Sequence, residues 1–398
     1  MNVQLGLKTY LSRISATQLF LGIAVLGVAL RLLAASRGWN WDMGAWWKHA
    51  NYISDWRSFY QKLPWDNYAP GWSIILYGLN ALPYFGLEPF LALRYKVVIL
   101  LTAVDMCIAY LLWREYSIRA SALFLLNPIS ILITGYHSQF DNIYVLCGLI
   151  AVLSMKKNEQ KISYAGLSLL GFSMIIKHGL FLFPFWLAIR AIMAKNFRIA
   201  AATLYIPYAL FFLSFIPFAL EPGMPEVIWN AVVHYRGFNN APFWTMLKPI
   251  WPKFILTQFT MHAITSFQLF IFTLCVLSMC WYKRKLDEYF FLYLLSMVIF
   301  SSTIANQYLT IVSVAIAIYP NCFFMLYMLL GGIYLAGDQN GLHIAWVAQT
   351  LSRTVGDANA CYRLLIMVLF AGLLFMQVKL RRYGSLLCAT PIPEKTGD

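Results

Sequence analysis

The chain has 398 residues, of which 61% are hydrophobic and 12% are charged, and its formal net charge is +14. Soluble domains are roughly half apolar and a quarter charged, so this composition excludes a water-exposed globule and predicts an integral membrane protein. The Lys and Arg residues lie in short segments between apolar runs, and no basic stripe interleaved with aromatic residues occurs. That arrangement orients membrane helices and excludes nucleic acid as the expected partner.

Long apolar runs follow one another along most of the chain. A spanning helix needs about 20 apolar residues, or about 17 if it stands upright. We expect a single all-α, polytopic domain over residues 1–398, with about 11–13 spans and twelve preferred. The predicted spans are 14–35, 92–113, 119–136, 141–156, 162–177, 179–194, 199–220, 262–282, 287–304, 307–320, 322–337 and 363–380. Residues 262–398 form the variable C-terminal part.

The basic loops predict the orientation of these spans. Lys and Arg cluster before residue 14 and near residues 114–119, 156–161, 190–198, 283–285 and 379–382. The positive-inside bias places all of them on the cytoplasmic side. Loops on one side are separated by even numbers of spans, so the short segment 70–86, which carries Pro70 and Pro83, is predicted to be an interfacial or re-entrant helix. The large outer segments are then 36–91 and 221–261, with a further polar one at 338–362.

Candidate functional residues follow the predicted outer ends of the spans. Asp42 lies among Trp39, Trp41, Trp46 and Trp47, where partial desolvation would raise the pKa of its carboxyl and make it a better base. The alternative is an aromatic belt with one solvated acid. Tyr136, His137, Gln139, Asp141 and Asn142 form a turn between two apolar runs, where buried polar groups need partners. This turn favours a ligand site.

Several cations are also expected at the outer face. Lys177 precedes His178 at a helix junction, where a lipid phosphate or a carboxylate such as Asp141 or Glu221 would explain its charge equally well. Arg236 lies in the later loop, and a guanidinium suits phosphate oxygens. Arg31 either snorkels to the interface or joins a phosphate pocket. Gln307, near the mouth of a late span, suits a site or a plain helix cap.

The order of these motifs resembles the GT-C superfamily of membrane glycosyltransferases, and most of all the dolichyl-phosphoglucose-dependent glucosyltransferases of asparagine-linked glycosylation and their bacterial relatives. The likeness covers roughly residues 31–245. Ala69 stands where a proline is usual, Asp141 where another polar residue is common, and Pro242 precedes Phe243. The stretches that carry the resemblance are WDMGAWWKHANYI, DNYAPGWSIILYGL, NPISILITGYHSQFDN, IIKHGL and RGFNNAPFW.

The resemblance implies a GT-C type A fold with interfacial helices in large outer loops, and an inverting single displacement. Asp42 would be the catalytic base, while Lys177, Arg236 and Arg31 would bind the donor phosphate. The residues implied in sugar or acceptor binding are His137, Gln139, Asp141, Tyr68, His178, Asn239, Trp244 and Gln307. No cofactor is implied. A metal shared by Asp42 and Asp141 is the less favoured option.

The implied donor is a polyprenyl-phosphate hexose, glucose or mannose, and the acceptor is a lipid-linked glycan or a cell-surface polymer. The short loops favour a bacterial inner membrane, with the site facing the periplasm. The main alternative is a polytopic lipid or sugar transporter or flippase, in which Asp105 would relay protons. No internal repeat of halves, which many transporters show, is evident in the sequence. An inactive scaffold subunit leaves the outer polar motifs unexplained.

Overall fold

The structure is a computed structural model that describes residues 15–63, 66, 68–157, 159, 161–233, 241–246 and 263–383. Every regular element in these ranges is helical, as the composition predicts. The elements are α2 (Ala16–Ser36), α3 (Asp42–Tyr52), α4 (Phe59–Lys62), α5 (Gly71–Asn80), α6 (Pro89–Glu115), α7 (Ile118–Leu125), α8 (Pro128–Gly135), α9 (Asp141–Lys156), α10 (Tyr164–Ile176), η1 (His178–Leu180), α11 (Phe183–Met193), α12 (Phe197–Leu213), η2 (Ile216–Phe218), α13 (Met224–Val233), α14 (Pro242–Met246), α16 (Ala263–Trp281), α17 (Leu286–Ile299), α18 (Tyr308–Ile311), α19 (Ser313–Ile318), α20 (Cys322–Gly337), α21 (Ala345–Thr354) and α22 (Ala358–Tyr383).

Four helical stretches of the described chain are long and apolar enough to cross a membrane: Ala16–Ser36, Pro89–Glu115, Phe197–Phe218 and Ala358–Leu380. The bent pair α7 and α8 makes a fifth if it is counted as one span. Several shorter apolar helices accompany them. Each of the twelve predicted spans coincides with a helix or a pair of helices. The preferred count of twelve crossings stays a prediction.

The predicted span 119–136 is broken in the structure. Its two halves, α7 and α8, meet at an angle of 52°. Proline has no N–H to donate and clashes with the preceding turn, so a new helix begins at Pro128. Asn127 caps that helix, because its side-chain oxygen accepts a hydrogen bond from the backbone N–H of Ile129 at 3.0 Å. The break therefore follows from two adjacent residues.

The core is centred on α17. All fourteen of its residues are buried, including Asp287 and Glu288 in its first turn. A helix that is apolar on every side belongs in the middle of a helical assembly. Around it pack α9, α16, α18, α19 and α22. The negative charge of Asp287 is balanced by Lys156, whose Nζ donates a hydrogen bond to its carboxylate at 2.6 Å.

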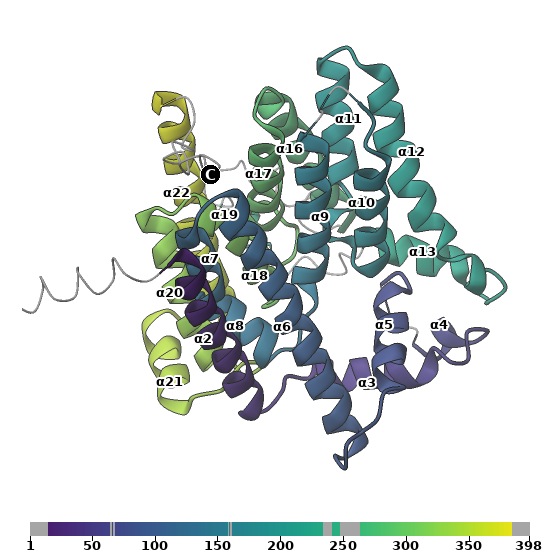
Figure 1. Cartoon of the computed structure of the whole chain (residues 1–398), viewed down its shortest axis with the longest axis vertical. Coiled ribbons are helices and arrows are strands. Elements are labelled where there is room, and N and C mark those ends of the chain that lie inside the picture. Colours follow the sequence, from purple (N-terminus) through teal and green to yellow (C-terminus); the bar gives the residue numbers. More distant parts are fainter. Residues whose placement is uncertain are drawn as a thin grey trace, which may run out of the picture.

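The two ends of the helical body gather different parts of the chain. In Figure 1, α3, α4 and α5 lie at the lower end, and the turn that joins α11 to α12 lies at the upper end. Segments predicted to be outer contact one another, as in the pairs Asn40–His137 and Lys177–Asp141. Segments predicted to be cytoplasmic do the same, as in the pairs Lys156–Asp287 and Arg190–Glu159.

The segment 70–86 contains one short helix. Its helix α5 has ten residues, so at about 1.5 Å per residue it covers about half of a membrane core roughly 30 Å thick. It packs against α3 and α6 at the lower end in Figure 1. Gly71 lets it approach α10, because a Cβ there would lie 2.7 Å from the carbonyl oxygen of Ile175. A short helix in this place suits the predicted interfacial position.

Candidate active site

Asp42 is the first residue of α3, which follows a short connection from α2. A carboxylate in the first turn interacts favourably with the helix dipole. Arg94 of α6 fixes the connection, because its guanidinium donates to the backbone carbonyls of Ala35 and Gly38 and also lies over the ring of Trp39. These contacts set where α3 begins and so where the Asp42 carboxylate lies.

The two carboxylate oxygens of Asp42 are used differently. Oδ2 accepts hydrogen bonds from Asn40 Nδ2 at 2.8 Å and from Gln139 Nε2 at 2.5 Å. No described residue donates to Oδ1, and the side chain is half-buried. Burial raises the pKa of Asp42, which the Asn40 bond and the charge of Lys177 partly offset. The Asp42 carboxylate is therefore fixed in position by hydrogen bonds to Oδ2, whereas Oδ1 is open to a ligand. Its affinity for a proton is increased.

His137 is joined to Asp42 through Asn40. Asn40 Nδ2 also lies 3.1 Å from His137 Nδ1, and since the amide is the donor, Nδ1 is the accepting nitrogen and Nε2 carries the proton. Burial lowers the pKa of His137 to about 4, so the ring is neutral near pH 7. Ser138, which follows it, has φ 55°, a strained conformation for a non-glycine residue. The tight turn thus aims His137 and Gln139 at the same region.

Lys177 is paired with Asp141. Its Nζ lies 2.8 Å from Asp141 Oδ2, and the two side chains are 2% and 0% exposed. Of the two carboxylates that the sequence left open, Asp141 is the partner. Glu221 instead accepts hydrogen bonds from the backbone N–H groups of Phe59, Tyr60 and Gln61 at the start of α4.

Aromatic rings surround the Lys177 ammonium. Its Nζ lies 4.7 Å from the ring centroid of Phe140, 5.7 Å from that of Tyr68 and 6.0 Å from that of Tyr308. Rings at these distances stabilise a cation. Tyr68 stacks on His178 with centroids 6.0 Å apart, so the predicted sugar-binding residues Tyr68 and His178 do lie together beside the ion pair.

Three buried polar atoms around Asp42 have no hydrogen-bond partner among the described residues. They are Asn40 Oδ1, His137 Nε2 and Gln139 Oε1. Buried polar atoms in folded proteins are almost always hydrogen-bonded, so such a concentration needs a bound molecule or water to satisfy it. A cavity of about 440 Å³ opens next to it, lined by Trp39, Asn40, Trp41, Gly44, Ala45 and Lys48.

Arg31 lies in an interior network apart from this cluster. Its Nε donates to Asp105 Oδ2 at 2.7 Å, and its other donors reach Gly27 O, Leu125 O and Ser130. Asp105 also accepts from Thr134 and Asn142. Four of the roughly five N–H groups of a guanidinium are thereby occupied. The geometry favours a structural role for Arg31 over either surface position considered from the sequence, and it gives Asp105 fixed partners.

Of the remaining predicted residues, the structure describes Trp244 and Gln307. Trp244 donates from Nε1 to the carbonyl of Phe300 at 2.9 Å and packs on Phe243, away from the Asp42 cluster in its contacts. Gln307 is half-buried and directly precedes Tyr308. Arg236 and Asn239 lie outside the described residues.

Among the described residues, no three His, Cys, Asp or Glu side chains are placed to hold a metal ion. The expected metal independence stays a prediction.

Two residues of the cluster, Asn40 and Phe140, were not singled out from the sequence. Asn40 precedes Asp42 by two positions and donates a hydrogen bond to its carboxylate. Asn side chains often form such local hydrogen bonds, so this spacing was the signal in the sequence that could have identified Asn40. Phe140 is an aromatic residue next to an apolar run, and only the fold brings its ring to Lys177.

Comparison with known proteins gives no further guidance. No family model, no curated protein and no solved structure matches this chain. Fold and site together define a membrane protein whose described elements are all helical and which holds a cluster of largely buried polar and charged side chains at one end.

Proposed function

We propose that this protein is an integral-membrane glycosyltransferase of the GT-C type, which moves a hexose from a polyprenyl-phosphate donor to an acceptor hydroxyl. The observation that carries the proposal is the Asp42 carboxylate, held at Oδ2 by Asn40 and Gln139 and left open at Oδ1. A base needs a fixed position and a raised proton affinity, and burial supplies the latter.

The chemical step is a single displacement. Asp42 Oδ1 takes the proton of the acceptor hydroxyl as its oxygen bonds to the anomeric carbon. The bond from that carbon to the donor phosphate oxygen breaks, and the electron pair leaves with the lipid phosphate. The configuration at the anomeric carbon is inverted. After transfer, the proton on Asp42 passes to water.

Lys177 supplies positive charge to the departing phosphate. Its ammonium carries three N–H donors and one of them is used on Asp141, so two remain for phosphate oxygens. The surrounding rings and the near-complete burial strengthen such an interaction. Arg236 joins Lys177 in the proposal as the second cation. Arg31, most of whose donors are occupied, is left out of it.

The sugar hydroxyls pair with the unsatisfied buried atoms. His137 Nε2–H is a donor, whereas Gln139 Oε1 and Asn40 Oδ1 are acceptors. A hexose hydroxyl is both donor and acceptor, so it suits this mixed set better than a purely anionic or a purely apolar ligand does. Tyr68 and His178 offer an aromatic face beside it.

The test is a transfer assay on the purified full chain. The donor is radiolabelled polyprenyl-phosphate glucose or mannose, and membrane lipids supply the acceptor. We expect Asp42→Asn to reduce transfer by about 10²- to 10⁴-fold, the usual contribution of a general base. The matched control is Asp55→Asn, an exposed carboxylate of the same segment whose partners are Lys62 and Ser58.

Two results would overturn the proposal outright, and a third would remove Asp42 from it. One is the absence of donor-dependent transfer by the wild-type protein with every hexose tried. The other is transfer by Asp42→Asn at the same rate as by the wild type. Equal losses in Asp42→Asn and Asp55→Asn would assign the effect to the fold of the segment, and would remove Asp42 from the role of base.

A further inference from the structure

A second cavity lies at the end of the helical body opposite to Asp42. It has a volume of about 670 Å³ and is lined by residues from α9 through α12 and from the α16–α17 turn. Volumes of about 300–1,000 Å³ are typical of small-molecule sites. Its lining is Met155, Glu159, Lys161, Ile162, Ser163, Leu167, Leu187, Arg190, Ala191, Ala194, Asn196, Ile199, Thr203, Tyr282, Lys283 and Leu286. The Asp42 cluster uses none of these residues.

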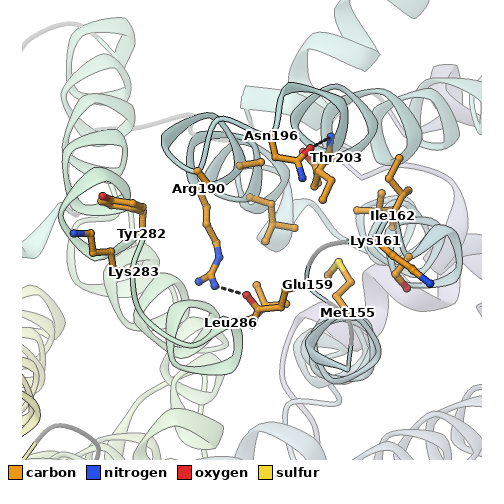
Figure 2. Close-up of a pocket in the computed structure, with 16 residues that line it drawn as sticks. Met155, Glu159, Lys161, Ile162, Arg190, Asn196, Thr203, Tyr282, Lys283 and Leu286 are labelled. Carbon is orange, nitrogen blue, oxygen red and sulfur yellow. Dashed lines mark hydrogen bonds and ion pairs between the residues drawn. The ribbon is translucent and has the colours of Figure 1, made fainter.

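Charge and hydrophobicity are separated within this cavity. Figure 2 shows Arg190 reaching across it to Glu159, with Lys283 on one side and Lys161 on the other, their amines directed outward. Apolar side chains such as Met155, Leu187 and Ile199 form much of the remaining wall. The lining therefore carries three cations and one carboxylate beside a large apolar share.

The cations keep unused hydrogen-bonding capacity. Arg190 donates from Nη2 to Glu159 at 2.5 Å and from Nη1 to the carbonyl of Arg284. These are two of roughly five N–H groups in a guanidinium. Lys161 and Lys283 are exposed and form no ion pair within the described residues. A half-buried guanidinium and two flexible lysines can therefore close on one anion.

We propose that this cavity binds the headgroup of an anionic phospholipid. Its phosphate would lie between Arg190 and the two lysines, with the first part of the acyl chains against the apolar wall. Basic pockets between helix ends at a membrane surface favour such lipids. A free phosphate matches the cations but leaves the apolar wall uncovered, whereas an amphiphile satisfies both parts of the cavity.

The test measures lipid binding by the delipidated full chain in detergent. Native mass spectrometry and thermal unfolding report on added phosphatidylglycerol, with phosphatidylcholine, glycerol 3-phosphate and inorganic phosphate as separate arms. We expect saturable binding and a raised unfolding midpoint with phosphatidylglycerol only. The double variant Lys161→Gln, Lys283→Gln is expected to bind it about 10- to 30-fold more weakly, as removal of two cations near a lipid phosphate implies.

Two further variants separate the cavity from the general basic surface. Lys157→Gln with Lys195→Gln removes the same charge from exposed positions that do not line the cavity, and it should bind like the wild type. Ala194→Phe adds a bulky side chain to the lining without changing charge and should weaken binding. Equal losses in both lysine pairs, or equal binding of phosphatidylcholine, would overturn the proposal. Equal binding of glycerol 3-phosphate would replace the lipid by a soluble phosphate and would also overturn it.

Discussion

Asp42 and Asp141 lie in the same cluster and have different environments. Asp42 accepts only neutral amide donors, on one oxygen, whereas Asp141 is bonded to the Lys177 ammonium at 2.8 Å. Pairs of carboxylates whose surroundings differ in this way commonly divide chemical roles between them. In the proposed mechanism, proton transfer therefore belongs to Asp42 and charge balance to Asp141, which is the counter-ion of Lys177.

The pH dependence of transfer tests the role of Asp42. Its ionised form is required, and burial raises its pKa, so activity should fall as the pH is lowered through that raised value. The Asn40 hydrogen bond lowers the same pKa, so Asn40→Ala should move the acidic limb of kcat/KM to higher pH. An unchanged limb, or one that moves to lower pH, would contradict this assignment.

Asp42→Asn is expected to affect stability and transfer differently. A carboxyl whose pKa is raised on folding destabilises the folded state above that pKa, and the cost disappears below the unfolded value. Asp42→Asn removes a partly desolvated charge, so it should be at least as stable as the wild type near pH 7 while transfer is lost. Thermal unfolding at pH 7 measures this. A lower unfolding midpoint would make Asp42 a structural residue.

The Lys177–Asp141 pair separates stability from function. Removing one partner of a buried ion pair typically costs about 3–5 kcal/mol, so Lys177→Met should lower the free energy of unfolding by that amount. Adding Asp141→Leu removes the uncompensated charge and should recover most of the loss. Transfer should stay absent in the double variant. Denaturant unfolding and the transfer assay together check this, and an active double variant would limit Lys177 to a structural role.

At the scale of elements, the interior network fixes the helices that carry the site. Arg31 of α2, Asp105 of α6, Thr134 of α8 and Asn142 of α9 are joined by hydrogen bonds. Asn142 is the second residue of α9, so the network holds the start of the helix whose first residue is Asp141. Asp105 accepts hydrogen bonds from each of the other three side chains, so the network ties α2, α8 and α9 to α6.

The close contact of α2 with α8 yields a prediction. A Cβ at Gly135 would lie 2.4 Å from the carbonyl oxygen of Arg31 and 2.8 Å from Ala34 Cβ. Backbone must then move, so Gly135→Ala should destabilise the protein by about 1–3 kcal/mol in thermal or denaturant unfolding. Gly22→Ala is the control, because nothing lies within 4 Å of its Cβ. Equal stability of the two variants would contradict the contact.

At the scale of the whole molecule, the two ends of the helical body are chemically distinct. One end holds the Asp42 cluster beside a cavity lined by tryptophans, and the other holds the basic cavity. The positive-inside bias predicts that the basic end faces the cytoplasm. The glycosyl donor and the anionic lipid would then occupy opposite faces of the membrane.

Labelling with a membrane-impermeant thiol reagent checks this sidedness. In a variant without the seven native cysteines, a single cysteine at Phe85, which is 85% exposed, should react from the outside of intact cells. One at Lys157 should react only after the membrane is opened. Reaction of both positions from the same side would overturn the orientation.

Much of the helical layout was predictable from the sequence. Each predicted span contains a helix because apolar runs and their caps are local features, such as Glu88 and Pro89 at the start of α6. The break at Pro128 was missed as a bend, although proline is its physical cause. The sequence also placed Asp42, Lys177, His137, Gln139 and Tyr68 among the candidates, and the fold brings these five together.

The sequence by itself determined that the protein lies in a membrane and where most of its helices lie. Both follow from hydropathy, basic loops and helix caps, which act over about 20 residues or fewer. Only the tertiary structure decided the pairings. It selected Asp141 over Glu221 for Lys177 and turned Arg31 inward to Asp105. It also connected Asn40 to His137 across 97 positions. A buried charge takes the partner that packing brings within hydrogen-bond distance, and that distance depends on how helices far apart in the chain come together.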